Sequence, residues 1–328
     1  MSRAVVLGAT GHIGAHVVRA LLAKGYAVRA AYRTPRYRLA LEGLPVEQAS
    51  CDIEEAASLR RVLEGCALAV HCAGYYPGFT TPRDRAIALG LEQIRRVFEV
   101  FRASGLARVV YVSSAATIAP QPGRLSTEAD QEPWPLAQWK PLYATVKIAM
   151  EHAVLRYHRH GFPVVIVNPS VCVGEYDARP FSGRLVLLFA RGTMPVYLDY
   201  HLNVVYTGDV GAGAVAAAEQ GQLGARYLLA HQNVTLGELA HAVARVAGVR
   251  PPRWRLPYPV AMGAAALTEA VAAVTRTEPL LPRSTVRLAR HGQRLDPARA
   301  RRELGLPQTP MEEAIRRALA WFRQHGYR

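Results

Sequence analysis

The chain of 328 residues is 50% hydrophobic and 20% charged, a balance that supports a substantial core and excludes a disordered chain. Its formal net charge of +15 comes mostly from arginines. These arginines form no run of five like charges and accompany no nucleic-acid-reading motif, so nucleic acid is not an expected partner.

Over the first two thirds of the chain, short β-branched runs alternate with longer helical patterns. The expected strands are 4–7, 27–31, 68–72, 109–113 and 164–167, and the expected helices are 13–24, 56–63, 83–104 and 143–160. Such alternation implies crossover connections and a parallel sheet that is buried on both faces. After an irregular stretch, residues 203–206, 209–219 and 226–230 are expected to return to this sheet.

Beyond residue 233, helices separated by proline-rich breaks are expected, including 260–274 and 311–325. The run 260–274 is interrupted by Glu269 and is shorter than the ~18 residues of a membrane span. No integral membrane segment is therefore expected, and a contact with a membrane surface stays open. The expected fold is α/β: a Rossmann doubly wound sheet from residues 1–170 plus 203–232, with a smaller, mostly helical substrate domain from 171–202 plus 233–328.

Three glycines lie between the first strand and the first helix. Gly8 permits a tight turn, Gly11 lets the backbone approach a pyrophosphate, and Gly14 lets helix and strand pack closely. The anion then lies at the helix N-terminus, where free N–H groups favour negative charge. This pattern predicts a dinucleotide cofactor.

The end of the second strand bears on the choice of cofactor. No carboxylate stands about 20 positions after the glycines, where one would bind the ribose hydroxyls of NAD. Arg33 stands there instead, and a guanidinium suits a 2′-phosphate. We expect NADP(H) to be preferred and NAD(H) to be possible, with Asp52 and the adjacent Ile53 near the adenine.

Tyr143 and Lys147 are spaced by one helical turn and so share a helix face. A positive charge about 4 Å from a phenol is worth roughly 4 kcal/mol at an effective dielectric of 20, which would lower the tyrosine pKa to near 7. Ser114 ends a predicted strand, at the sheet edge where such folds bind ligands. Asn168, with the Pro169–Ser170 pair after it, ends the next strand and is expected to contact the nicotinamide amide through its backbone.

Together these motifs, with His71-Cys72-Ala73-Gly74, resemble the extended short-chain dehydrogenase/reductase family, also described as NAD-dependent epimerases/dehydratases, over essentially the whole chain. The resemblance implies that Ser114, Tyr143 and Lys147 are catalytic. It also implies a set of residues around the cofactor. That set is Gly8, Thr10, Gly11, His12, Ile13, Gly14, Arg33, Asp52, Ile53, Cys72, Ala73, Tyr143, Lys147, Asn168, Pro169 and Ser170.

Two branches of that family look most similar. The run Ser113-Ser114-Ala115-Ala116-Thr117 is similar to dihydroflavonol reductases, and Val164–Ser170 is similar to hopanoid-associated sugar epimerases. Sugar-nucleotide epimerases carry an arginine at the position of Leu202, which clamps the diphosphate, so this chain departs from them there. Aromatic residues could instead line an apolar substrate pocket. Those residues are Tyr75, Tyr76, Trp134 and Tyr176.

The predicted function is reduction or oxidation of a secondary alcohol or ketone on a small, fairly apolar molecule. The alternatives are a nucleoside-diphosphate-sugar epimerase or dehydratase and a non-catalytic redox-sensing binder. The resemblance implies a homodimer formed by the helices at 83–104 and 143–160. The four cysteines lack paired spacing and the N-terminus enters a strand at once, so free thiols, no metal and a cytoplasmic location are expected.

Overall fold

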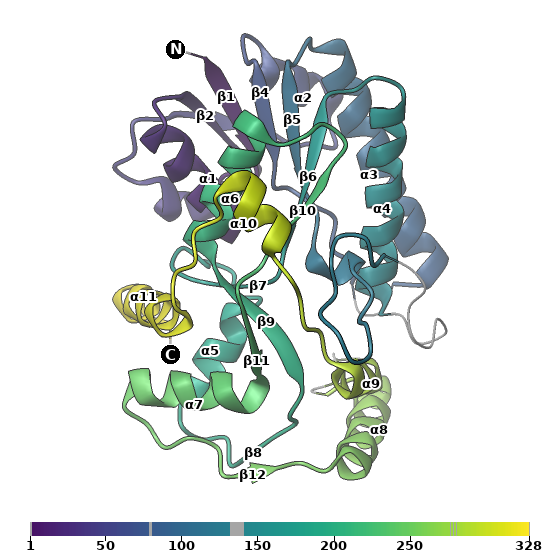
Figure 1. The fold of residues 1–328 in the computed structure, drawn as a ribbon, viewed down its shortest axis with the longest axis vertical. Coiled ribbons are helices and arrows are strands. Elements are labelled where there is room, and N and C mark those ends of the chain that lie inside the picture. Colours follow the sequence, from purple (N-terminus) through teal and green to yellow (C-terminus); the bar gives the residue numbers. More distant parts are fainter. Residues whose placement is uncertain are drawn as a thin grey trace.

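The computed structural model describes residues 2–78, 81–131, 141–275, 277, 279 and 281–327. A seven-stranded parallel sheet forms its larger part, in the order β10-β6-β5-β4-β1-β2-β3 (Figure 1). Its strands are β1 (Arg3–Leu7), β2 (Ala27–Tyr32), β3 (Glu47–Ser50), β4 (Leu68–His71), β5 (Arg108–Val112), β6 (Val164–Pro169) and β10 (Arg226–Leu229). This confirms the predicted doubly wound α/β fold.

Helices cover both faces of this sheet (Figure 1). One face carries α1 (His12–Ala23), α6 (Thr207–Gln220) and α10 (Ala298–Leu304), and the other carries α2 (Ala56–Leu63), α3 (Arg83–Ala103) and α4 (Leu142–Arg159). Because side chains alternate across a strand, Val6 of β1 packs with the first group and Val5 with the second. Burial on both faces explains why these strands are continuous apolar runs.

The strand order reverses at β1, which lies between β4 and β2. Ligands of doubly wound sheets bind beyond the carboxyl ends of the strands at such a switch point. The glycine turn follows β1, Cys72–Gly74 follow β4, and Ser113–Ser114 follow β5. The fold therefore brings the predicted cofactor and catalytic segments to one sheet edge.

A second sheet has three strands: β7 (Val171–Val173), β9 (His201–Tyr206) and β11 (Gln232–Thr235). The expectation that residues 203–206 return to the large sheet was wrong, because β9 pairs with β7 and β11. The expectation for 226–230 was confirmed, because β10 pairs with β6. Leu202, Val204 and Tyr206 of β9 pack with α5 (Gly183–Ala190), α7 (Leu236–Ala247) and α11 (Met311–Gln324), whereas Val205 packs with the core of the large sheet.

The remaining elements are short strands and helices on both parts of the molecule. The two-residue strands β8 (Val196–Tyr197) and β12 (Trp254–Arg255) pair with each other, and 3-10 helices span Pro35–Leu41 and Ala115–Thr117. Helices α8 (Tyr258–Thr275) and α9 (Arg283–His291) pack against each other at one end of the molecule (Figure 1). In length and composition α8 alone among the described helices could cross a membrane, which for a single helix is a weak indication.

Candidate active site

The glycine turn after β1 has the geometry that its sequence predicts. Gly8 has φ +79°, and a Cβ on it would lie 3.0 Å from the backbone nitrogen of Ala73. A Cβ on Gly14 would lie only 2.1 Å from the carbonyl oxygen of Gly8. These two glycines are therefore required by the turn itself and by the close approach of α1 to it.

Gly11 lies differently, at the N-cap of α1. Among the described atoms, a Cβ on Gly11 would meet only the carbonyl oxygen of Gly8, at 3.2 Å. No side chain caps this helix, and no acidic residue occupies its first turn. Its leading N–H groups and open glycine are therefore suited to a phosphate, so the residues present fit a dinucleotide.

The other predicted residues of this turn are partly buried. Ile13 packs against the core on the face of the sheet that α1, α6 and α10 cover. Thr10 is half-buried. The His12 ring hydrogen-bonds the Thr207 hydroxyl at 2.8 Å and lies 3.7 Å from the Asp177 carboxylate. Burial lowers the pKa of His12. Its side chain thus links the turn to α6 and to the segment after β7.

The predicted adenosine-side residues follow adjacent strands. Arg33 is exposed directly after β2, and Asp52 is half-buried shortly after β3. Cys51, which lies between β3 and Asp52, donates its N–H to the carbonyl of Tyr32. The Asp52 carboxylate accepts the N–H of Glu54 at 3.0 Å. Ile53 packs with the core on the α2 side of the sheet. The structure therefore brings Arg33 and Asp52 to the same edge.

The residues after β4 lie beside the glycine turn. The Cys72 N–H donates to the carbonyl of Leu7 at 2.9 Å, and burial raises the pKa of the Cys72 thiol to about 12. Ala73 borders Gly8, as described above. Both residues lie at the edge formed by β1 and β4, and their contact with a cofactor stays a prediction.

Ser114 and Tyr143 are in direct contact, although they lie on different elements. Ser114 follows β5 and caps the 3-10 helix by accepting the Ala116 N–H, while Tyr143 lies in the first turn of α4. Ser114 and Tyr76 both lie close enough to the Tyr143 hydroxyl to shift its pKa. The Tyr76 ring stacks on the Tyr143 ring, with centroids 5.3 Å apart and an interplanar angle of 19°.

Lys147 lies one turn further along α4 and is 2% exposed. Its ammonium nitrogen is 4.9 Å from the ring centroid of Tyr76 and 5.7 Å from that of Tyr143. A positive charge within about 6 Å of an aromatic ring centroid is attracted by the ring. The structure thus brings the three predicted catalytic residues together and adds Tyr76 to them.

Our expectation that the pKa of Tyr143 lies near 7 was wrong. Burial raises the pKa of Tyr143 well above its usual value, Tyr76 adds to this rise, and the hydrogen bond from Ser114 opposes it. Burial also lowers the pKa of Lys147 to about 8, against the attraction of Glu151. Removal from water disfavours both charged forms, so the phenol is neutral near pH 7.

A buried polar network supports this cluster, and sequence reasoning missed it. Glu151 is fully buried one turn after Lys147. It accepts hydrogen bonds from the Ser113 hydroxyl at 2.5 Å and from the Asn168 amide at 2.7 Å, and lies 2.7 Å from the Arg226 guanidinium. The i, i+4 spacing from Lys147 could have revealed Glu151, but its partners come from β5, β6 and β10.

This network engages the residues predicted to contact the nicotinamide. The Asn168 amide also donates to the Ser114 carbonyl at 3.2 Å. The Ser170 N–H donates to Leu229 at 3.1 Å, and its hydroxyl donates to Asn203 at 2.8 Å. Pro169 is buried at the end of β6. A cofactor contact at these three residues stays a prediction.

Gly74 is a second position whose role the sequence did not reveal. A Cβ on Gly74 would lie 2.6 Å from the ammonium nitrogen of Lys147. His71, three residues earlier, is 1% exposed, and neither ring nitrogen has a partner among the described residues. Burial lowers the pKa of His71 to about 3, and the charge of Lys147 adds to this effect. A neutral imidazole and a bare glycine therefore leave space around the ammonium group.

The predicted substrate residues divide into three cases. Tyr76 touches Tyr143 and also Phe181, with ring centroids 5.8 Å apart. Tyr75 packs partly into the core on the α3 side. Tyr176 has φ +67° and packs against His16, Trp321 and the Arg19 guanidinium. None of these three contacts of Tyr176 is with the catalytic cluster, and Trp134 lies outside the described residues.

Comparisons with known proteins agree with this geometry. A family described as NAD dependent epimerase/dehydratase matches residues 4–230. Sterol demethylase protein B of Methylococcus capsulatus is 34% identical over 327 residues, which cover 98% of each chain. A putative dihydroflavonol 4-reductase of Synechocystis is 32% identical over 329 residues, covering 98% of this chain and 95% of the relative.

A solved structure gives the same result in three dimensions. A nucleoside-diphosphate-sugar epimerase from Pseudomonas aeruginosa superposes with a TM-score of 0.81 at 27% identity. The superposition covers 99% of both chains.

Proposed function

The chain belongs to the NAD-dependent epimerase/dehydratase family of extended short-chain dehydrogenases/reductases, and within it we propose an NADP(H)-dependent enzyme that interconverts a secondary alcohol and a ketone. The observation that carries the proposal is the contact of Ser114 with the Tyr143 hydroxyl, next to the buried ammonium of Lys147. These groups stand at the sheet edge that also carries the glycine turn.

In reduction, the Ser114 hydroxyl donates a hydrogen bond to the substrate carbonyl oxygen. The Tyr143 hydroxyl donates its proton to that oxygen, a task for which a neutral phenol is in the correct state. The Lys147 ammonium stabilises the phenolate that remains and is placed to bind a ribose hydroxyl. When bound, the nicotinamide supplies the hydride in reduction or accepts it in oxidation.

Substitution of Tyr143 by Phe tests this mechanism. We expect turnover to fall at least 100-fold, on the order of the contribution of a general acid, while the dissociation constant for NADPH stays within about twofold. Turnover would be followed as NADPH consumption with a panel of apolar ketones. The matched control is Tyr26→Phe. Tyr26 is a half-buried tyrosine that follows the C-terminal end of α1, away from the glycine turn. Retained turnover in the Tyr143 variant refutes the role.

Several observations support an apolar substrate. Leu202 replaces the diphosphate-clamping arginine expected of sugar-nucleotide enzymes, and it is buried in the core of the small sheet. Tyr76, whose ring stacks on Tyr143, is 55% exposed, and Phe181, whose ring contacts Tyr76, is 74% exposed. Two relatives over nearly the whole chain are named for a sterol and for a dihydroflavonol. We infer a ring-containing alcohol or ketone of that type.

A nucleoside-diphosphate-sugar epimerase is the second candidate, favoured by the name of the Pseudomonas aeruginosa structure. It requires a cofactor that stays bound through a complete turnover. Thermal stabilisation by UDP- or TDP-sugars, together with NAD(H) retained through purification, would select it over the reductase. Stabilisation by neither sugar would eliminate it.

For the cofactor, we propose NADP(H) over NAD(H), with Arg33 as the ligand of the 2′-phosphate. Arg33 is exposed at the end of β2, where a carboxylate would otherwise bind ribose hydroxyls. Arg33→Ala should raise the Michaelis constant for NADPH about tenfold or more and leave that for NADH nearly unchanged. Arg60→Ala, an exposed arginine on α2, is the control. An unchanged ratio in the Arg33 variant refutes the assignment.

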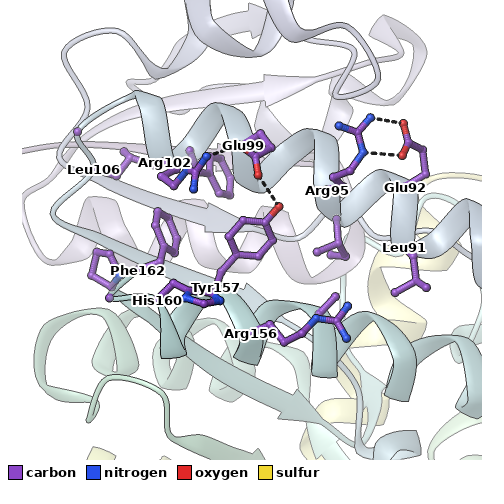
Figure 2. A pocket seen from close by; sticks show the side chains of 16 residues that line it. Leu91, Glu92, Arg95, Glu99, Arg102, Leu106, Arg156, Tyr157, His160 and Phe162 are labelled. Atoms are coloured by element: carbon purple, nitrogen blue, oxygen red, sulfur yellow. Dashed lines mark hydrogen bonds and ion pairs between the residues drawn. The ribbon is translucent and has the colours of Figure 1, made fainter.

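We also propose a homodimer through α3 and α4. A groove of about 680 Å³ lies on the outer side of these helices, and it shares no residue with the catalytic cluster. Figure 2 shows Tyr157 and Phe162 on one side of Arg95 and Arg156 and Leu91 on the other. Arg156→Glu should convert a dimer to a monomer in light scattering, and a wild-type monomer would contradict the proposal.

We also propose a cytoplasmic location for the protein. All four cysteines are free, which suits a reducing compartment.

A further inference from the structure

Helix α8 exposes an apolar stripe. Val260 is 55% exposed, Leu267 67%, Val271 53% and Val274 85%. These positions recur at helical spacing, so their side chains lie on one face, and Gly263 and Ala270 on the same face are exposed as well. The opposite face is buried, through Ala261, Ala265 and Ala272.

The exposed face of α8 carries no charge. The only charged residue of the helix is Glu269, which lies toward α9. Its carboxylate accepts a hydrogen bond from the Arg283 guanidinium at 2.5 Å and another from the Arg283 backbone N–H at 2.7 Å. The helix therefore offers water an apolar surface, and its one carboxylate is neutralised by the neighbouring helix.

Arginines of α9 lie on the side of α8 that faces away from this stripe. Arg283 adjoins Glu269 in the second half of α8, and the Arg290 guanidinium lies 5.3 Å from the ring centroid of Tyr258 at the start of α8. Arg287 lies between these two arginines along α9, near enough for its charge to help lower the pKa of Glu269. Helix α9 contains no carboxylate. The two helices thus combine an exposed apolar face on α8 with a row of positive charge on α9 behind it.

We propose that the exposed face of α8 and the arginine row of α9 bind the surface of a bilayer that contains anionic lipid. Apolar side chains enter the boundary between headgroups and acyl chains, and the guanidinium groups contact lipid phosphates. Trp254, 62% exposed on the strand leading into α8, suits the same boundary. This inference is independent of the proposed reaction.

The packing of α8 favours lying on a membrane over crossing one. Ala261 and Ala265 form a shared apolar cluster with Val286 of α9, to which Leu198 and Leu256 also contribute. Crossing a bilayer would require α8 to leave this cluster and to place Glu269 in hydrocarbon, separated from Arg283.

Charge also favours a membrane over a second copy of the chain. Two copies of the chain would each bring a net charge of +15 to a shared contact, which opposes their association. An anionic lipid surface is complementary to both the row and the net charge of +15.

Co-sedimentation of the full chain with vesicles tests the proposal. Phosphatidylcholine vesicles, with and without a minority of phosphatidylglycerol, would be mixed with wild-type protein, with Leu267→Glu/Val271→Glu and with Arg287→Gln/Arg290→Gln. Leu223→Glu, an exposed leucine after α6 at 41% exposure, is the matched apolar control. Thermal unfolding of each variant checks that the fold is retained.

We expect wild type and Leu223→Glu to sediment with anionic vesicles and much less with neutral ones. The Leu267/Val271 double variant should bind roughly tenfold more weakly, and the arginine variant should lose most of its preference for anionic lipid. Equal binding by wild type and the Leu267/Val271 variant would reduce the effect to general charge attraction and overturn the proposal. So would wild-type protein that stays in the supernatant, or self-association that the same variant abolishes.

Discussion

Gly74 gives the sharpest test of how the catalytic lysine is positioned. A methyl group at this position would lie 2.6 Å from the Lys147 nitrogen, whereas ordinary van der Waals contact begins at 3.4 Å. In Gly74→Ala the ammonium group must therefore move by roughly 0.8 Å, the difference between these two distances. A displacement of about 1 Å in a catalytic group can cost on the order of 10²-fold in rate.

The same substitution should not destabilise the protein. Gly74 is not among the glycines with positive φ, and the atom displaced is the end of a flexible side chain. Replacing glycine by alanine where the backbone allows it stabilises a protein by about 0.4–1 kcal/mol, because the unfolded chain loses freedom. We expect kcat to fall about 100-fold, with an unfolding temperature that is unchanged or slightly higher.

The assay compares kcat, the dissociation constant for NADPH and thermal unfolding in wild type, Gly74→Ala and Gly263→Ala. Gly263 lies on α8, and an added methyl there has nothing within 4 Å. Full activity in Gly74→Ala would refute the reasoning that a bare glycine positions the ammonium group. A loss of activity that tracks a loss of folded protein would refute it equally.

Three further predictions follow from the buried groups. The pKa of His71 in the folded protein is about 3, so between pH 6.5 and that value only the unfolded chain takes up a proton at this residue. The unfolding free energy therefore falls by about 1.4 kcal/mol for each unit by which the pH is lowered in this range. His71→Leu should reduce this slope in urea titrations. Lys147 loses its charge near pH 8, so NADPH affinity measured by fluorescence should weaken as pH rises through that value, and Lys147→Arg should remove the step. Glu151→Gln leaves the buried guanidinium of Arg226 without its carboxylate and should cost about 3–5 kcal/mol of unfolding free energy; a cost below 1 kcal/mol would show that the pair contributes little.

Features set by neighbouring residues were predicted from the sequence. The 3.6-residue period placed Tyr143 and Lys147 on one face of α4, and the alternation of strands with helices predicted the doubly wound sheet. The glycines of the first turn were predicted with their separate steric roles, and the structure gives Gly8 a positive φ and Gly14 a close contact with it. Each of these depends on spacing within one segment.

The tertiary structure decided what depends on segments far apart in the chain. Strand β9 joined the small sheet because its partners, β7 and β11, lie on either side of it in space. Tyr143 became a neutral phenol because burial outweighed the charge that the sequence placed one turn away. Glu151 met Arg226 only because α4 packs against the sheet whose last strand is β10.

Sequence spacing thus determined which groups this protein has for proton transfer and on which face of a helix they stand. It did not determine their protonation, because the free energy of removing a charge from water depends on everything packed around the group. That packing, contributed here by Tyr76, His71 and the bare Gly74, exists only once the strands and helices have assembled.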